Sequence, residues 1–167
     1  MDAELVALSE AVGSAALAKR DQCRLLIATA ESCTGGWAAQ VITHTSGSSE
    51  WFERGFVTYS NEAKTELLGV RPETIEKYGA VSPETAAAMA TGALNNSKAL
   101  IALAITGIAG PTGGSPGKPV GTVCFAWCRV GESAETETAV FAGDREAVRR
   151  QAVLHALRGL LLRLDAR

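Results

Sequence analysis

The most restrictive feature of this chain is the stretch 25–36, where an apolar segment runs into a polar turn and two adjacent glycines. Residues 25–30 are apolar enough for a buried strand, and the segment after Gly35 and Gly36 has the spacing of a helix. The backbone must reverse between them, and Ser32 lies at that reversal. The stretch therefore predicts a strand–turn–helix unit whose turn presents a serine.

The rest of the chain continues this alternation of strands and helices. Strands are predicted at 24–30, 54–59, 99–106, 121–129 and 136–141, and helices at 3–20, at 34–44, from Asn61 as cap, at 82–94 and from Asp144 as cap. The first three strands are expected to be parallel, whereas the short gap 130–133 favours an antiparallel hairpin. This order predicts an α/β fold, a three-layer α/β/α sandwich around a mixed, mostly parallel sheet.

Length and composition narrow the class of protein. The 167 residues are expected to form a single domain, 1–167. A net charge of −2 argues against a nucleic-acid partner, and the longest apolar runs are far shorter than a membrane span. The acidic N-terminus lacks the pattern of a signal peptide, so we expect a cytoplasmic protein.

The cysteines and histidines give no indication of a metal site. The four cysteines form no C-x-x-C pair, and the chain has only two histidines, His44 and His155. A zinc site is therefore not expected, and the cysteines are interpreted as free thiols.

Ser32 is the first candidate for chemistry. Gly35 and Gly36 can bring backbone N–H groups close to a ligand, and the N-terminus of a helix favours negative charge. A serine beside such an anion site is the minimum requirement for acyl transfer. The alternative is that Ser32 or Thr34 only caps the helix.

Two further polar residues, Tyr59 and Thr106, lie at the carboxyl ends of predicted strands. Ligands of open α/β sheets bind at this edge, and Lys64 lies close enough in sequence to Tyr59 to reach it. Neither histidine follows a strand, so a lysine with a lowered pKa is the candidate base for Ser32. The alternatives are that Lys64 is an ordinary surface lysine and that Tyr59 is only an aromatic residue at the rim.

The last helix and the longest loop offer candidate anion-binding groups. Arg145 and Arg149 lie four residues apart, where an arginine runs against the helix dipole, so either a bound anion or an ion pair with a glutamate is expected there. The loop 107–119 is long enough to indicate a functional role. It is not a nucleotide-binding P-loop, because Pro119 follows Lys118 and the loop leads into a strand.

Four motifs together resemble the CinA C-terminal domain family. They are Thr-Ala-Glu-Ser-Cys-Thr-Gly-Gly at 29–36, the segment 55–64 with Tyr59, Asn61 and Lys64, Gly-Ala-Val-Ser at 79–82, and Thr-Gly-Ile-Ala-Gly-Pro at 106–111. They keep the family order and cover essentially the whole chain. The sequence resembles the stand-alone form, without the N-terminal domain that many relatives carry.

The resemblance implies a function and roles for these residues. Family members are nicotinamide-nucleotide amidases, which hydrolyse nicotinamide mononucleotide to nicotinic acid mononucleotide and ammonia in pyridine-nucleotide salvage. It implies that Ser32 is the nucleophile, Lys64 its base and Tyr59 a catalytic support. The implied substrate-binding residues are Thr34, Gly35, Gly36, Thr106, Gly107 and Arg145.

The resemblance also implies the cofactors and partners. No metal or organic cofactor is required, and the partner is a small pyridine mononucleotide, with no nucleic acid and no membrane. The family further implies a homo-oligomer. Two alternatives remain: Cys33 could be the nucleophile of a thiol amidase, or the protein could be a non-enzymatic nucleotide binder that serves competence or DNA-damage responses.

Overall fold

The computed structural model describes residues 1–165. Its strands form one five-stranded sheet in the order β2-β1-β3-β4-β5. The strands are β1 (Ile27–Glu31), β2 (Phe52–Val57), β3 (Ile101–Gly107), β4 (Thr122–Arg129) and β5 (Glu135–Val140). β1 pairs in parallel with β2 and β3, whereas β4 is antiparallel to both of its neighbours. Four strands thus share one direction, which confirms the predicted mixed sheet.

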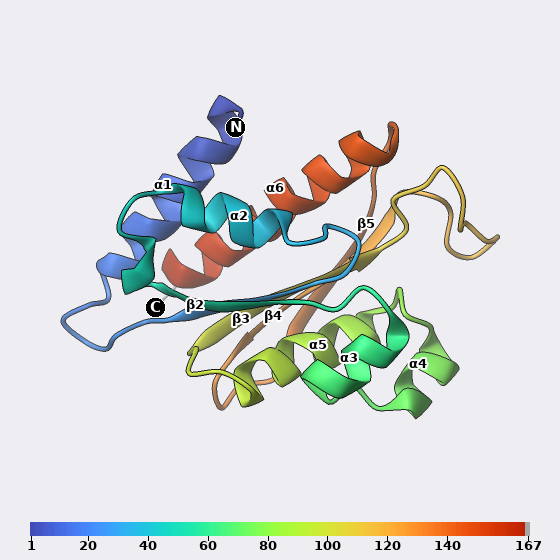
Figure 1. Cartoon of the computed structure of the whole chain (residues 1–167), viewed down its shortest axis with the longest axis horizontal. Coiled ribbons are helices and arrows are strands. Elements are labelled where there is room, and N and C mark those ends of the chain that lie inside the picture. Colours follow the sequence, from blue (N-terminus) through green and yellow to red (C-terminus); the bar gives the residue numbers. More distant parts are fainter. Residues whose placement is uncertain (166–167) are drawn as a thin grey trace.

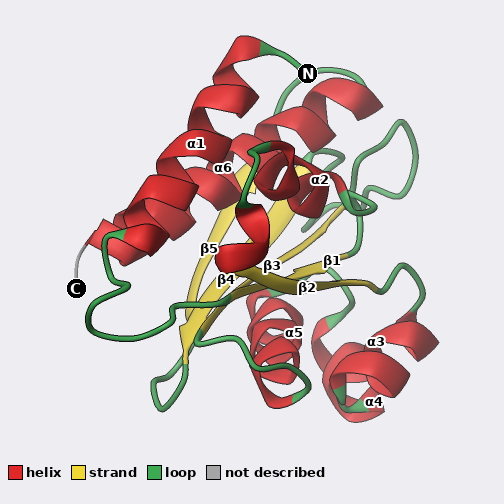
Figure 2. Cartoon of the chain, turned by 60° about the vertical axis from the view of Figure 1, so that its left-hand side comes forward, coloured by secondary structure: helices red, strands yellow, loops and turns green. Residues whose placement is uncertain are grey.

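Helices cover both faces of the sheet and make the fold a three-layer α/β/α sandwich. The helices are α1 (Ala3–Leu17), α2 (Trp37–His44), the short 3₁₀ helix η1 (Ser48–Glu50), α3 (Asn61–Leu68), α4 (Pro72–Tyr78), α5 (Pro83–Asn95) and α6 (Arg145–Asp165). Figure 1 shows α1, α2 and α6 on one face and α3, α4 and α5 on the other, and the turned view in Figure 2 shows the same division.

The two faces of the sheet differ in the size of their side chains. Toward α1, α2 and α6 the central strands present large residues: Ile27, Ile101, Leu103, Ile105, Val123, Phe125 and Trp127. Toward α5 they present small ones: Ala28, Ala30, Ala102, Ala104, Cys124, Ala126 and Cys128. Because α5 is itself rich in alanine, it packs close to the sheet. Cys124 and Cys128 face the same way, as expected from their spacing.

Three local features differ from the sequence-based expectations. Helix α2 begins at Trp37 and not at residue 34, because Gly35 and Gly36 have φ of 60° and 99° and form a turn. Helix α3 is capped by the side chain of Ser60, which accepts from the N–H of Ala63, and not by Asn61. Helix α4 was not predicted, because its seven residues are too short to show a buried stripe.

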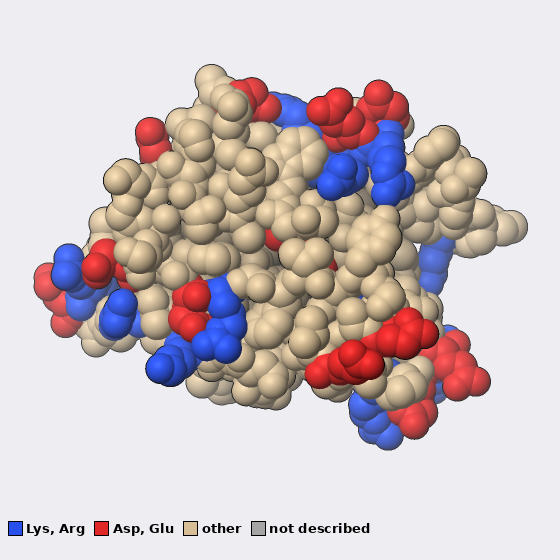
Figure 3. All heavy atoms as spheres, viewed as in Figure 1, with Lys and Arg blue, Asp and Glu red and all other residues tan. Residues whose placement is uncertain are grey.

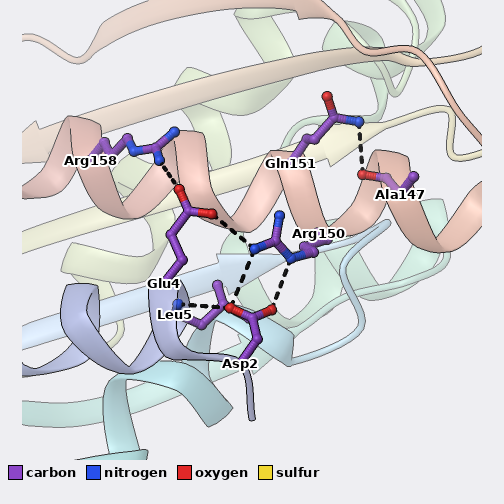
Figure 4. A network of polar contacts seen from close by, with 7 residues as sticks. All are labelled: Asp2, Glu4, Leu5, Ala147, Arg150, Gln151 and Arg158. Atoms are coloured by element: carbon purple, nitrogen blue, oxygen red, sulfur yellow. Dashed lines mark hydrogen bonds and ion pairs between the residues drawn. The ribbon is translucent and has the colours of Figure 1, made fainter.

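An exposed network of ion pairs fastens the N-terminus of α1 to α6 (Figure 4). Arg150 donates from Nε to Asp2 Oδ2 at 2.9 Å and from Nη2 to Glu4 Oε1 at 2.9 Å. Glu4 also accepts a hydrogen bond from Arg158, about two helical turns further along α6, and Asp2 caps α1 by accepting from the N–H of Leu5. Two helices that are remote in sequence are therefore joined at their polar sides as well as by apolar packing.

Charge on the surface is mixed. On the face shown in Figure 3, lysines, arginines, aspartates and glutamates lie mainly around the periphery, and acidic side chains gather at the lower right over α3 and α4.

Within residues 1–165, none of the helices is both long enough and apolar enough to cross a membrane.

Candidate functional site

The carboxyl ends of the three parallel strands bring the predicted site residues to one edge of the sheet. Glu31, the last residue of β1, lies opposite Val57 of β2 and Ile105 of β3. The pairing continues one residue further, because the N–H of Ser32 donates to the carbonyl of Ile105 at 2.9 Å and that of Thr58 donates to Glu31. Ser32 and Tyr59, just after their strands, and Thr106, near the end of β3, therefore lie at the same edge of the sheet, as the sequence predicted.

Lys64 reaches Ser32 from the first turns of α3. Its Nζ lies 3.0 Å from Ser32 Oγ, 3.2 Å from the carbonyl oxygen of Thr58 and 3.3 Å from that of Tyr59. The lysine is only 1% exposed and Ser32 is 8% exposed. Lys64 is therefore not a surface lysine, and the alternative left open by the sequence is excluded by its burial.

The surroundings of Lys64 suit a neutral amine. A neutral amine has two N–H donors and one lone pair, and Nζ has two carbonyl acceptors and one hydroxyl within hydrogen-bond distance. Burial lowers the pKa of Lys64, because the charged form loses its hydration. The lone pair can then accept the proton of the Ser32 hydroxyl.

The turn after Ser32 differs from the expected anion site. The N-terminus of α2 is already capped by the buried carboxylate of Glu31, which accepts from the N–H groups of Ala38 at 2.8 Å and Ala39 at 3.0 Å. The hydroxyl of Thr34 also donates to Glu31, at 2.6 Å. An anionic ligand cannot occupy this helix end, because a side-chain carboxylate is already there.

Thr34, Gly35 and Gly36 are consequently not brought into the pocket beside Ser32. Thr34 is fully buried with its hydroxyl on Glu31, and the N–H of Gly35 donates back to the carbonyl of Ser32 at 3.0 Å. The backbone N–H of Cys33 remains available. Within residues 1–165 it donates to no other residue, and Cys33 lines the pocket.

Tyr59 and Arg145 meet at the mouth of the pocket. Arg145, at the start of α6, donates from Nη2 to Tyr59 Oη at 2.9 Å and from Nη1 to the carbonyl of Gly110 at 2.8 Å. Tyr59 is 61% exposed as a residue, whereas its carbonyl contacts Ser32 and Lys64. Tyr59 therefore contributes to the site through its backbone at the nucleophile and through its hydroxyl at the rim.

Thr106 and Gly107 form the floor at the end of β3. The Thr106 hydroxyl donates to the carbonyl of Ala80 at 2.7 Å and ties the loop before α5 to the sheet. A Cβ on Gly107 would lie 2.8 Å from Val123 Cγ2 and 3.1 Å from Cys33 Sγ, so glycine is required for this close packing.

These residues enclose one pocket of about 270 Å³, near the lower end of the range for small-molecule sites. Its lining consists of Ser32, Cys33, Tyr59, Asn61, Lys64, Ala80, Val81, Thr106, Gly107, Ile108, Ala109, Gly110, Thr112, Gly113 and Arg145. The pocket is thus lined by the hydroxyl of Ser32 and the amine of Lys64 on one side and by the guanidinium of Arg145 on another.

Sequence reasoning missed two residues that shape this site, Glu31 and Arg149. Glu31 could have been found, because strand alternation turns it toward α2 with Ile27 and Thr29. Arg149 was expected to share an anion or an ion pair with Arg145, but it binds the carbonyls of Cys33 and Thr34. Within the described part of the chain, neither arginine is in a salt bridge.

The other candidate nucleophile and bases lie in unsuitable surroundings. Burial, and secondly the charge of Glu31, raise the pKa of the Cys33 thiol to about 12. His155 lies 3.1 Å from Glu137 and packs on Phe125, and His44 ends α2.

The protein is a three-layer α/β/α sandwich, and a buried serine–lysine pair lies at the end of its first strand. The family model of the CinA C-terminal domain matches residues 7–164. The chain therefore belongs to the CinA C-terminal domain family, as its four motifs predicted.

Curated relatives and solved structures agree with this assignment. "Nicotinamide-nucleotide amidohydrolase PncC" of Escherichia coli K12 is 55% identical over 95% of this chain and 94% of its own length. A "CinA-like protein" of Akkermansia muciniphila is 50% identical over 90% of this chain, but over only 35% of its own length. The crystal structure of competence/damage inducible protein CihA from Agrobacterium tumefaciens has a TM-score of 0.90 and 40% identity, and the match covers 99% of this chain and 98% of that one.

Proposed function

We propose that this protein is a nicotinamide-nucleotide amidase, which hydrolyses the carboxamide of nicotinamide mononucleotide to the acid and ammonia in pyridine-nucleotide salvage. The observation that carries the proposal is the 3.0 Å contact between Ser32 Oγ and the buried amine of Lys64 at the base of a small pocket. Relatives named as nicotinamide-nucleotide amidohydrolases, at 55% identity over nearly the whole chain, support this substrate class and the predicted enzyme class.

The first half of the reaction forms an acyl-enzyme. Ser32 Oγ attacks the carboxamide carbon while Lys64 Nζ accepts the hydroxyl proton. The negative charge that develops on the carboxamide oxygen is held by the backbone N–H of Cys33, the residue after the nucleophile, which donates to no other residue of the described chain. Lys64 then returns its proton to the leaving nitrogen, so ammonia departs and an ester on Ser32 remains.

The second half releases the acid. A water molecule loses its proton to Lys64 and attacks the ester carbon, and Ser32 recovers the proton as the carbon–oxygen bond breaks. The carbonyls of Thr58 and Tyr59 hold Lys64 Nζ in place in both protonation states, because each state has at least two N–H donors. One lysine therefore serves as base and acid in turn.

The mouth of the pocket suits the phosphate of the mononucleotide. Lys64 and Arg145 are the cationic residues of the pocket lining, and the carbonyl of Gly110 and the hydroxyl of Tyr59 hold the guanidinium of Arg145 in position. A phosphate bound there would orient the carboxamide toward Ser32 without contacting the reacting atoms.

Ser32→Ala tests the proposal, with ammonia release from nicotinamide mononucleotide as the measurement. We expect the rate to fall by at least ~10³-fold with little change in the melting temperature, because the nucleophile is lost but little packing is removed. Cys33→Ala separates the thiol alternative, because it would remove the nucleophile of a thiol amidase. Loss of ammonia release in Cys33→Ala together with its retention in Ser32→Ala would overturn the proposal.

A further inference from the structure

Arg149, a residue of α6, binds the backbone of the turn that carries Ser32. Its Nε donates to the carbonyl of Cys33 at 3.0 Å, and its Nη2 lies 3.3 Å from the carbonyl of Thr34. The guanidinium lies 5.8 Å from the centre of the Trp37 ring, at the start of α2. One rigid, planar group thus holds two consecutive peptide units.

The direction of the Cys33 N–H follows from the hydrogen bonds around it. The Ser32 carbonyl accepts from Gly35, and in a trans peptide the N–H of Cys33 points the opposite way. The N–H of Ser32 is fixed on β3 through Ile105, and the carbonyl of Cys33 is fixed by Arg149. The peptide units on both sides of the Cys33 N–H are therefore held in place.

We propose that Arg149 is a positioning residue, which holds the Cys33–Thr34 peptide so that the N–H of Cys33 faces the oxygen of the substrate carboxamide. This inference rests on the proposed amidase function. Arg149 touches neither Ser32 nor the pocket, so it acts only through the backbone of the turn. A positive charge at position 149 is not sufficient for this role, because two carbonyls in fixed positions require the forked donors of a guanidinium.

The experiment compares Arg149→Ala and Arg149→Lys with the wild type, and uses Arg150→Ala as a matched control. Arg150 is the next residue of α6, but it binds the exposed carboxylates of Asp2 and Glu4, remote from the turn. Steady-state kcat and KM for nicotinamide mononucleotide are measured well below each melting temperature, which is determined by circular dichroism.

For Arg149→Ala we expect kcat to fall ~10- to 100-fold while KM stays within about threefold, because the oxyanion exists only in the transition state. Arg149→Lys keeps the charge but not the fork, so its kcat should remain several-fold below that of the wild type. Arg150→Ala should keep the wild-type kcat even where its melting temperature falls. A wild-type kcat in folded Arg149→Ala or in Arg149→Lys overturns the inference, and Arg149→Lys decides the matter if Arg149→Ala does not fold.

A second measurement separates this inference from the choice of substrate. Phenylmethanesulfonyl fluoride places a sulfonyl oxygen where the carboxamide oxygen would lie, and mass spectrometry follows its attachment to Ser32. Slower labelling of Arg149→Ala than of Arg150→Ala supports the positioning role even if the wild type releases no ammonia from the mononucleotide, a result that would refute only the proposed substrate. Equal labelling rates, or no labelling of Ser32 in the wild type, overturn the inference.

Discussion

Lys64 is the residue whose protonation state decides whether the serine–lysine mechanism can operate. Burial lowers its pKa, and the activity should therefore fall as the pH decreases and the amine gains a proton. Lys64→Arg keeps the positive charge but cannot lose its proton, so we expect it to be nearly as inactive as Lys64→Ala. Ammonia release over a range of pH is the measurement.

The binding of the nucleotide provides the control for this substitution. A thermal-shift assay with nicotinamide mononucleotide should show that Lys64→Arg still binds, since Arg145 at the mouth of the pocket is unchanged. Near-normal turnover by Lys64→Arg would mean that a charge beside Ser32 is enough, and Lys64 could not be the base.

At the scale of elements, the α1–α6 ion pairs should make stability depend on pH. The hydrogen bond from Arg150, followed by that from the N–H of Leu5, lowers the pKa of Asp2 to about 2 from its ordinary value of 3.8. A carboxylate with a lowered pKa stabilises the fold above the unfolded value and loses that contribution as the pH falls through the folded value. The loss should therefore occur between about pH 4 and pH 2.

Arg150→Ala tests this prediction by thermal unfolding at several pH values. The variant should melt below the wild type at pH 5, and the difference should shrink toward pH 2 and in high salt, because the pairs are exposed. Arg71→Ala is the control, since its 3.7 Å pair with Glu73 joins neighbouring residues that are both largely exposed. A difference between Arg150→Ala and the wild type that stays constant from pH 5 to pH 2 would contradict the assignment.

The close approach of α5 to α3 gives a second prediction at this scale. A Cβ on Gly92 would lie 1.9 Å from the carbonyl oxygen of Leu68, at the last residue of the helix that carries Lys64. Gly92→Ala should therefore push the two helices apart, destabilise the fold by about 1–3 kcal/mol and lower the melting temperature by at least ~2 °C. It should also reduce ammonia release, because Lys64 would move away from Ser32.

Gly117→Ala is the matched control for this substitution. A Cβ at Gly117, in the β3–β4 loop, would have no heavy atom within 4 Å, so the melting temperature should not change. A melting temperature of Gly92→Ala equal to that of Gly117→Ala would show that α5 adjusts without cost.

At the scale of the whole molecule, the pocket is assembled from four loops, the end of β3 and the starts of α3 and α6, and the proposed phosphate contact is made from α6. Nicotinamide riboside lacks the phosphate and should be hydrolysed with a kcat/KM at least ~10²-fold below that of the mononucleotide. In Arg145→Ala this preference should largely disappear, because the mononucleotide loses its partner and the riboside does not. An Arg145→Ala variant that discriminates as strongly as the wild type would remove Arg145 from the phosphate site.

The alternation of strands and helices was readable in the sequence because burial imposes it. β3 and β4 are covered on both faces, so each appears in the sequence as a short, almost continuous apolar run, which is typical of a central strand. The amphipathic helices α1 and α6 were predicted for the same reason. Helix α4 was missed, and the start of α2 was placed three residues early, because seven residues and a glycine turn leave no clear periodic pattern.

The sequence by itself determined which residue types stand at the strand ends, and hence that Ser32, Tyr59 and Thr106 would share one edge of the sheet. Only the tertiary structure decided what each group does there. The contacts of Lys64 with Ser32, and of Arg149 with Cys33, join residues 32 and 116 positions apart. Such pairs depend on how elements that are remote in sequence pack together, and local sequence patterns carry no information about that packing. The same packing placed Glu31 on the N-terminus of α2, so the N–H of Cys33, and not Gly35 or Gly36, is the proposed donor to the substrate oxygen.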